Sequence, residues 1–431
     1  MVNHFNYLIP LAALALPAQK PLSIQDAIRT AWTRQPGLQA GQAMVERAQA
    51  EAEAMRALRM PTLAVSAGLT RTDEPMAAFG AKLNQARITQ NDFSPDLLNH
   101  PDPVTGAGAL VSLAQPLYAG GRLDAARRAG AAMAASETAS QGRRRQEVAL
   151  AVDQAYFGAQ VAEQALAWAE DSLRQARETE RFVQARVAEG LMLKSEGERT
   201  RAFRAQCEAG VAEANQRLAS ARSALALLLG GEVPAQLATP VESDEAAPSG
   251  PGVRGDLEAA REQAEAARQG VAGARGSLKP EVGLNLSAGT AHNSLSSGGN
   301  WTTVSVGARW SFSFTDSHKV QAARAAARAA DLDLQWRRQQ AGREVEEARR
   351  GLETARARIA YAKVALAASE SVRTLRAARH REGLLPLVDV LDAEAALSGA
   401  RTLLLSSRLD WRITRAQLAL ALGQPIEDVK E

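Results

Sequence analysis

Cysteine, aromatic residues and an excess of one charge sign are all scarce in this chain. Its 431 residues include a single cysteine, Cys207, and only 4% are aromatic. One thiol excludes a disulfide framework and a multi-cysteine metal site, so we expect Cys207 to fill a helix position. Lysine and arginine total 51 against 48 aspartates and glutamates. The formal net charge of +3 provides no strong basic field, and we expect no nucleic-acid partner.

Long hydrophobic runs are also missing. The longest strongly apolar run, Leu8–Leu16, is interrupted by Pro10 and is far shorter than the roughly 20 residues that a membrane-spanning helix needs. It has the length of the apolar part of a secretory signal peptide, with a small residue just before Gln19. We therefore expect residues 1–20 to be a signal peptide, although no lysine or arginine precedes the run.

Sequence patterns that carry catalysis do not occur. The zinc-protease pattern H-E-x-x-H, the phosphate-binding loop and the nucleophile elbow G-x-S-x-G are all absent. Gly270, Gly273 and Gly276 are spaced as on a helix, so we expect them to permit close helix packing rather than to bind phosphate. The histidines lie in different predicted elements without metal-ligand spacing, and they are His4, His100, His292, His318 and His380. We expect no enzyme activity, no metal and no cofactor.

The chain does contain many helix-forming residues and an internal repeat. Alanine, which loses no side-chain entropy in a helix, is its most frequent residue. One order of elements occurs twice: a helix that runs into a proline, two strands, a very long helix and a last helix. We place the first repeat at 21–233, a linker rich in proline, serine and glycine at 234–253, the second repeat at 254–423 and a tail at 424–431.

Four segments are expected to be strands. In the third, Val282, Leu284 and Leu286 alternate with Gly283 and Asn285, which predicts one apolar and one polar face. The strands are expected at about 61–73, 107–118, 280–291 and 301–315, with a long loop at 73–106 and a short one at 292–300. Each is about as long as a transmembrane β-strand.

Aromatic side chains cluster around these strands. They are Tyr118, Trp301, Trp310, Phe312 and Phe314. Such a cluster is typical of the girdle at a membrane interface, and aromatics that pack on a soluble core give a similar pattern.

Four strands cannot close a barrel alone, and an open sheet edge is not viable in lipid. The pattern leaves two architectures open: a membrane barrel shared by several chains, and a soluble coiled-coil scaffold with a β cap.

The two long helices carry a heptad seam. Within residues 152–187 the seam positions follow alternating steps of three and four, and only Glu180 among them is polar. The second half repeats these steps within residues 345–366. At 1.5 Å per residue, Arg122–Ala188 spans about 100 Å and Lys319–Arg381 about 95 Å. No compact domain is that long, so we expect each long helix to pack beside two shorter helices stacked end to end.

The repeat resembles a known family. Its element order, the segment Gln115–Arg122 after the second strand and the segment Val388–Ala393 in the last helix are similar to the TolC-like outer-membrane efflux proteins, over Pro21–Gly423. The resemblance implies a mainly α protein with a β-barrel portion. Three chains would form a 12-stranded barrel in the outer membrane, joined to a trimeric α-helical tunnel in the periplasm.

The same resemblance implies a function. It is that of a passive exit duct for efflux or secretion, gated at its periplasmic tip. The partners implied are two further copies in a homotrimer, a periplasmic adaptor (membrane fusion) protein, an inner-membrane transporter and outer membrane lipid. The alternative is a structural or adhesive coiled-coil protein of the cell envelope.

Site residues follow from the resemblance at matching positions. Asp389 and Asp392 correspond to the family's gate and selectivity carboxylates. They are three residues apart on a predicted helix and therefore share one face. Three chains would bring six carboxylates together around one axis. The competing interpretation is that they are acids favoured near a helix N-terminus. The family's gate-closing tyrosine and arginine align with His380 and Leu385, so the closing contacts must differ. Arg379 and Arg381 are our candidates for that role.

Each long helix ends at a Glu-Gly-Leu turn. The resemblance implies that these turns are the periplasmic tips that meet the adaptor, and they comprise Glu189, Gly190, Leu191, Glu382, Gly383 and Leu384. The competing interpretation is that they are simple hairpin turns, in which glycine only supplies the left-handed residue that closes a helix.

Overall fold

The computed structural model describes residues 21–242, 246–294 and 297–427. The predicted signal peptide and the last four residues of the predicted tail lie outside this part. The chain divides into two compact units. Unit 1 comprises Met1–Gly41, Gly142–Arg254 and Gln340–Glu431, and unit 2 comprises Gln42–Gln141 and Gly255–Gln339. Each unit therefore contains corresponding parts of both sequence repeats.

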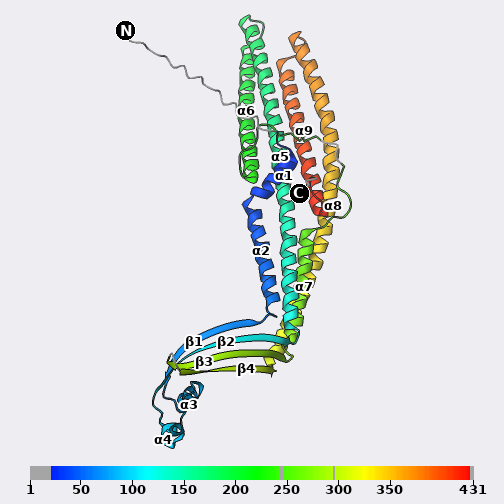
Figure 1. Cartoon of the computed structure of the whole chain (residues 1–431). Helices are drawn as coiled ribbons and strands as arrows, with labels where there is room; N and C mark the ends of the chain where they lie inside the picture. The colour runs from blue at the N-terminus through cyan, green and yellow to red at the C-terminus, as the bar shows by residue number, and fades with distance from the viewer. Residues whose placement is uncertain (1–20, 243–245, 295–296, 428–431) are drawn as a thin grey trace, which may run out of the picture. The chain divides into compact units, whose positions relative to one another are not determined.

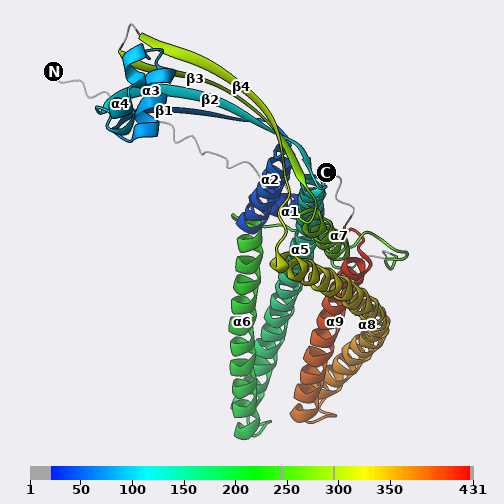
Figure 2. The same cartoon turned by 90° about the horizontal axis from the view of Figure 1, so that it is seen from below.

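Unit 1 is helical in its regular structure. It contains α1 (Ile24–Arg34), the later part of α5 (Arg122–Ala188), α6 (Lys194–Leu229), the later part of α8 (Phe314–Arg381) and α9 (Leu387–Leu422). The helices α5 and α6 form one antiparallel hairpin, and α8 and α9 form a second (Figures 1 and 2). Within the described residues, no helix has a stretch both long and apolar enough to cross a bilayer.

The predicted heptad seam of α5 is buried or half-buried in unit 1. Val152, Leu173 and Val183 of α5 all have less than a tenth of their surface exposed. The polar member of the seam, Glu180, forms an ion pair with Arg204 of α6 at 2.7 Å. The seam of α8 is buried or half-buried in the same way, whereas most residues between its positions are exposed. The seams thus provide the packing surfaces of these two helices.

The main core of unit 1 lies where α1 meets α5, α6 and α9. Its fully buried members include Ile28, Val152, Phe157, Leu225 and Ala416. Tyr156 donates a hydrogen bond to the Leu22 carbonyl at 2.7 Å and accepts one from the Thr239 backbone at 2.9 Å. These bonds attach the linker to the helices.

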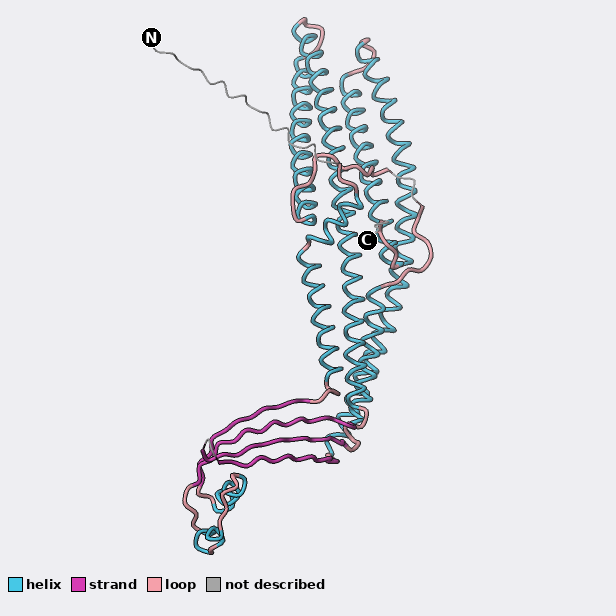
Figure 3. Tube along the Cα trace, in the orientation of Figure 1, coloured by secondary structure: helices cyan, strands magenta, loops and turns pink. Residues whose placement is uncertain are grey.

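Unit 2 contains one antiparallel sheet with the strand order β1-β2-β3-β4 (Figure 3). The strands are β1 (Thr62–Thr72), β2 (Val104–Ala119), β3 (Glu281–Ser294) and β4 (Ser297–Arg309). Its other elements are most of α2 (Pro36–Ala57), α3 (Pro75–Asn84), the 3-10 helix η1 (Gln90–Phe93), α4 (Pro95–Asn99), α7 (Gly255–Gly276) and the first parts of α5 and α8. At one end of the sheet β1 follows α2, β2 leads into α5, β3 follows α7 and β4 leads into α8.

Glycines allow the helices of unit 2 to approach closely where the sheet ends. Gly120 has φ of 63°, and a Cβ atom there would lie 2.2 Å from the Gly276 carbonyl oxygen. A Cβ atom at Gly276 would lie 2.9 Å from the Arg122 nitrogen. Gly273 faces Ala125 at an ordinary contact distance, whereas Gly270 has open space around it. Two of the three predicted glycines therefore lie at a helix contact.

Three elements differ from the sequence pattern. The short loop expected at 292–300 is largely strand, because β3 continues to Ser294 and β4 begins at Ser297. The fourth strand, expected at 301–315, ends at Arg309, because Ser313 and Asp316 cap α8: the Ser313 backbone donates to the Asp316 carboxylate at 3.2 Å. Helix α8 consequently begins at Phe314, and the apolar alternation continues into a segment that is not a strand. The loop expected at 73–106 contains α3, η1 and α4, two of which begin at a proline.

Candidate functional site

The two hairpin turns of unit 1 have the same backbone geometry. Gly190 and Gly383 have φ of 74° and 78°, in the left-handed region. The Leu191 nitrogen donates to the Arg186 carbonyl, and the Leu384 nitrogen donates to the Arg379 carbonyl, both at 2.9 Å. This is the Schellman pattern of a closed helix end. Glu189, Leu191, Glu382 and Leu384 are all exposed at these ends.

Asp389 and Asp392 lie in the first two turns of α9, just after the second hairpin turn. Asp389 is half-buried and Asp392 is exposed. Arg376 of α8 donates to the Asp389 carbonyl at 3.1 Å, and its guanidinium lies 4.0 Å from the Asp389 carboxylate. One of the two predicted gate carboxylates therefore has a cation beside it within its own chain.

Arg379 and Arg381 are not brought to these carboxylates within one chain. Both side chains are exposed, and the described part of the chain contains no ion pair for either of them. Arg376, which the sequence pattern does not indicate, lies beside Asp389 instead.

His380 has a contact that the sequence did not suggest. Its side chain is only 6% exposed, and its Nδ1 lies 2.8 Å from the Leu385 carbonyl oxygen. Its ring packs edge-to-face against Phe182 of α5, with 6.1 Å between ring centroids. The guanidinium of Arg186 lies over the other ring of this pair, 5.1 Å from the Phe182 centroid. The two hairpins of unit 1 are thus joined by an aromatic contact near their turns.

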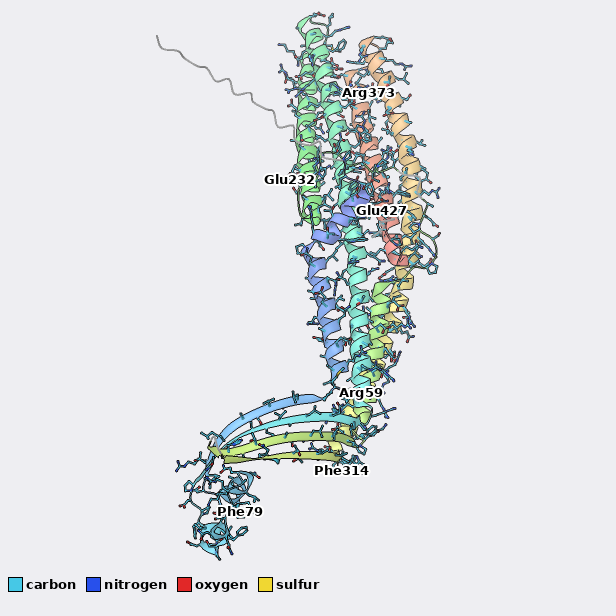
Figure 4. The ribbon with its side chains drawn as sticks, in the orientation of Figure 1. Arg59, Phe79, Glu232, Phe314, Arg373 and Glu427 are labelled. Atoms are coloured by element: carbon cyan, nitrogen blue, oxygen red, sulfur yellow. The ribbon has the colours of Figure 1, made fainter. Side chains whose placement is uncertain are left out.

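A second missed contact joins α8 to α9. Arg373 forms an ion pair with Glu394 at 2.7 Å, and both side chains are largely buried. Figure 4 labels Arg373 in the part of unit 1 near the hairpin turns. The sequence offers no signal for this pair beyond two opposite charges on neighbouring helices.

A groove of about 760 Å³ lies between α5, α6 and α9. Arg401 lines it, and its guanidinium lies 5.6 Å from the Trp168 ring centroid and 3.1 Å from the Asp171 carboxylate. Burial opposes ionisation of Asp171, but hydrogen bonds from Arg174 and Arg401 hold its pKa below the usual value. Cys207 also lines the groove, and burial raises the pKa of its thiol. Cys207 therefore occupies a helix position without the character of a reactive thiolate.

The sheet of unit 2 has two chemically different faces. Strand register places directly paired residues on one face. One face is mostly apolar and carries Leu63, Val65, Leu69, Val111, Leu113, Leu284, Leu286, Val304 and Val306, together with polar residues such as Arg71, Gln115, His292 and Thr302. The opposite face is mostly small or polar and carries Thr62, Ser66, Thr70, Gly106, Ser112, Ser287, Gly299, Thr303 and Ser305, with Leu110 and Trp301 as large apolar members. Several large side chains of the apolar face, such as Val65 and Val304, are about 70% exposed.

The predicted aromatic cluster divides into two groups. Tyr118, Trp310, Phe312 and Phe314 are exposed and lie at or beyond the ends of the strands that join the helices. Trp301 instead belongs to the polar face, where a Cβ atom at Gly289 would lie 2.4 Å from its ring. Four of the five aromatics therefore lie at one end of the sheet, and Trp301 covers a glycine.

Among the described residues, no group of three or more histidine, cysteine, aspartate and glutamate side chains is placed to hold a metal ion.

Comparison with known sequences gives one family. The family model described as outer membrane efflux protein matches residues 27–231 and 253–424. The match includes both hairpin turns, both aspartates of α9 and all four strands. No curated protein matches the chain.

Solved structures match nearly the whole chain. The outer membrane protein VceC of Vibrio cholerae is 22% identical, over 94% of this chain and 97% of its own, with a TM-score of 0.78. The open state of the MtrE outer membrane channel of Neisseria gonorrhoeae is 21% identical, over 95% and 91%, with a TM-score of 0.81. The CmeC outer membrane channel of Campylobacter jejuni is 16% identical, over 100% and 95%, also with a TM-score of 0.81. At these identities the likeness shows a shared fold.

Proposed function

The chain belongs to the outer membrane efflux protein family, and from this premise we propose that it is a passive exit duct for efflux or secretion, gated at its periplasmic tip. The observation that carries this proposal is the sheet with one apolar and one polar face. An apolar face suits contact with outer membrane lipid, and a polar face suits a water-filled interior. The proposed duct is passive, so the energy for transport comes from its partner proteins.

Assembly as a homotrimer is proposed from the sheet edges. Among the described strands, β1 and β4 are the outer members of the sheet, each with one unpaired edge. Unpaired backbone groups are costly in lipid. Pairing of β1 with β4 of the next chain removes these edges, and three chains of four strands give a 12-stranded barrel joined to a helical tunnel.

A row of exposed apolar side chains on α8 supports the same assembly. It comprises Tyr361, Val364, Val372 and Leu375, each at least 42% exposed. These residues lie away from the seam that packs within the chain. A neighbouring copy would cover them, because large apolar side chains in a row are rarely left in water.

Partners and gate are proposed at the hairpin end. The turns at Gly190 and Gly383 would dock a periplasmic adaptor protein, which links the duct to an inner-membrane transporter. Asp389 and Asp392 of three chains would surround one axis there and favour cations. Arg379 or Arg381 would help to close the tip by pairing with acids of a neighbouring chain.

Channel recording tests the proposed function. The purified assembly is added to a planar bilayer, and discrete cation-selective events are expected. Its mass in detergent by native mass spectrometry is expected to be that of three chains. A structural or adhesive coiled-coil protein, the alternative function, would give no conductance, and a monomer or a dimer would contradict the proposed assembly.

A further inference from the structure

The segment between β1 and β2, Pro75–Asn99, is an ordered element. Phe79 and Phe93 pack edge-to-face, with 5.7 Å between ring centroids. Lys82 donates to the Asp92 carboxylate at 2.9 Å, and the backbone and hydroxyl of Thr89 donate to it at 2.8 Å. The hydrogen bond from Lys82, aided by those from Thr89, lowers the pKa of Asp92 to about 2. The segment therefore has its own aromatic contact and its own charged anchor.

This segment is attached to the strand ends that lie away from the long helices. Gln85, at the end of α3, is 1% exposed and donates from its amide to the Thr105 carbonyl at 3.2 Å. Helix α3 contacts β2, β3 and β4. Figure 2 shows α3 and α4 at this end of the strands, and Figure 4 labels Phe79 within the segment.

The face on which α3 lies follows from two glycines. A Cβ atom at Gly106 would lie 2.6 Å from the Gln85 amide nitrogen, and one at Gly299 would lie 2.3 Å from the Asn84 carbonyl oxygen. Strand register places both glycines on the polar face, with Ser112 and Thr303. Glycine in a strand often marks a close approach of another backbone. Helix α3 therefore covers the polar face and not the apolar one.

We propose that Pro75–Asn99 narrows the outer mouth of the duct and sets a size limit for cargo there. The inference rests on the proposed function, because the polar face lines a duct only when several chains close the sheet. Since α3 lies on that face, three copies would project into the opening at the end opposite the long helices. A narrowed mouth admits small solutes and extended chains and excludes folded proteins.

Polymer exclusion in planar bilayers tests this proposal. Neutral polymers of graded size are added to one side at a time, and a polymer that enters the mouth lowers the single-channel current. The comparison uses the wild-type chain, a chain with 75–99 replaced by a short glycine-serine linker, and Gly299→Ala. The matched control is Gly307→Ala, on the same strand and face, where a Cβ atom meets nothing within 4 Å.

The size cut-off at the outer side is the decisive readout. We expect the linker chain to admit larger polymers from the outer side. We expect Gly299→Ala, whose added methyl group pushes the end of α3 off the sheet and toward the opening, to admit only smaller ones. The cut-off at the other side should stay unchanged, and Gly307→Ala should resemble the wild type. If channels form and the outer size cut-off is the same in all four proteins, this inference is overturned and the proposed function is not affected. Absence of channels in every protein contradicts the proposed function and the inference with it.

Discussion

The ring of His380 packs edge-to-face against the ring of Phe182, and this contact joins the two helical hairpins of one chain. His380 lies on α8, three residues before Gly383, and Phe182 lies on α5, eight residues before Gly190. The pair is therefore close to both predicted docking turns. A contact between hairpins at this place resists their separation, which is the movement that would widen the tip of a tunnel made from them.

Loss of the Phe182 ring should favour the open tip. An aromatic pair contributes about 0.5–1.5 kcal/mol beyond the area it buries. With Phe182→Ala we expect a several-fold higher open probability in bilayer recordings, whereas Phe182→Tyr, which keeps the ring, should resemble the wild type. An unchanged open probability in Phe182→Ala would show that the hairpins are held together by other contacts.

The two aspartates of α9 provide a direct test of the gate. Six carboxylates around one axis attract cations and repel anions. The double variant Asp389→Ala and Asp392→Ala should therefore have lower cation selectivity, measured as a reversal potential in a salt gradient, and weaker block by trivalent cations. If these acids only stabilise the start of α9 through the helix dipole, selectivity and block will stay as in the wild type.

Arg376 should act on selectivity with the opposite sign. Its guanidinium lies 4.0 Å from the Asp389 carboxylate and offsets part of that negative charge. Arg376→Gln should therefore raise cation selectivity. Arg379 and Arg381 have no ion pair in the described part of the chain. Arg379→Gln and Arg381→Gln should therefore raise the open probability if these residues close the tip between chains. A fall in cation selectivity with Arg376→Gln would contradict this account.

Patterns that recur along the chain were the ones that the sequence could predict. The seam of α5 is buried or half-buried over many turns, because an apolar residue recurs on the packing face in each turn. Its one polar residue, Glu180, does not interrupt the packing, since it forms an ion pair. Gly273 and Gly276 lie at a helix contact as expected, since small residues at helical spacing have few other uses. The alternation of β3 likewise gave the correct two faces.

Contacts between distant or competing residues were not predictable. Phe182 and His380 are far apart in the sequence, and nothing in either neighbourhood specifies the partner. At the end of β4, two local signals compete: Phe312 and Phe314 continue the strand alternation, whereas Ser313 and Asp316 cap a helix. The helix forms because the cap satisfies a backbone N–H group at its start, where no partner is available within the helix. The fold of Pro75–Asn99 depends on the ion pair between Lys82 and Asp92, which the sequence pattern does not indicate.

Substitution of the turn glycines tests whether the hairpin turns dock the adaptor or only cap their helices. A β-branched residue at φ of 74° or 78° costs roughly 1–2 kcal/mol and reshapes the turn. Gly190→Val or Gly383→Val should abolish chemical cross-linking to the adaptor, while the trimer and its conductance persist. Gly399→Ala in α9, where a Cβ atom meets nothing within 4 Å, is the control. Cross-linking that persists in both valine variants would remove the docking role from these turns.

Arg412 is 1% exposed and lies in the core of unit 1. Its guanidinium lies 4.2 Å from the Phe157 ring centroid and donates to the Val241 and Pro240 carbonyls at 3.0 and 2.9 Å. Its Nη1 also lies 3.8 Å from the Glu427 carboxylate. One buried side chain thus joins α9 to α5, to the linker and to the C-terminal segment.

Truncation of Arg412 should therefore be costly. Removing one partner from a buried ion pair costs about 3–5 kcal/mol, because the other groups lose their partner without regaining water. Arg412→Ala should lower the temperature at which the assembly dissociates, and protease should cut the linker earlier. Arg358→Ala is the matched control, because its pair with Asp410 is nearly half exposed and such pairs contribute about 0–1 kcal/mol. Equal losses in the two variants would show that Arg412 acts only as another surface charge.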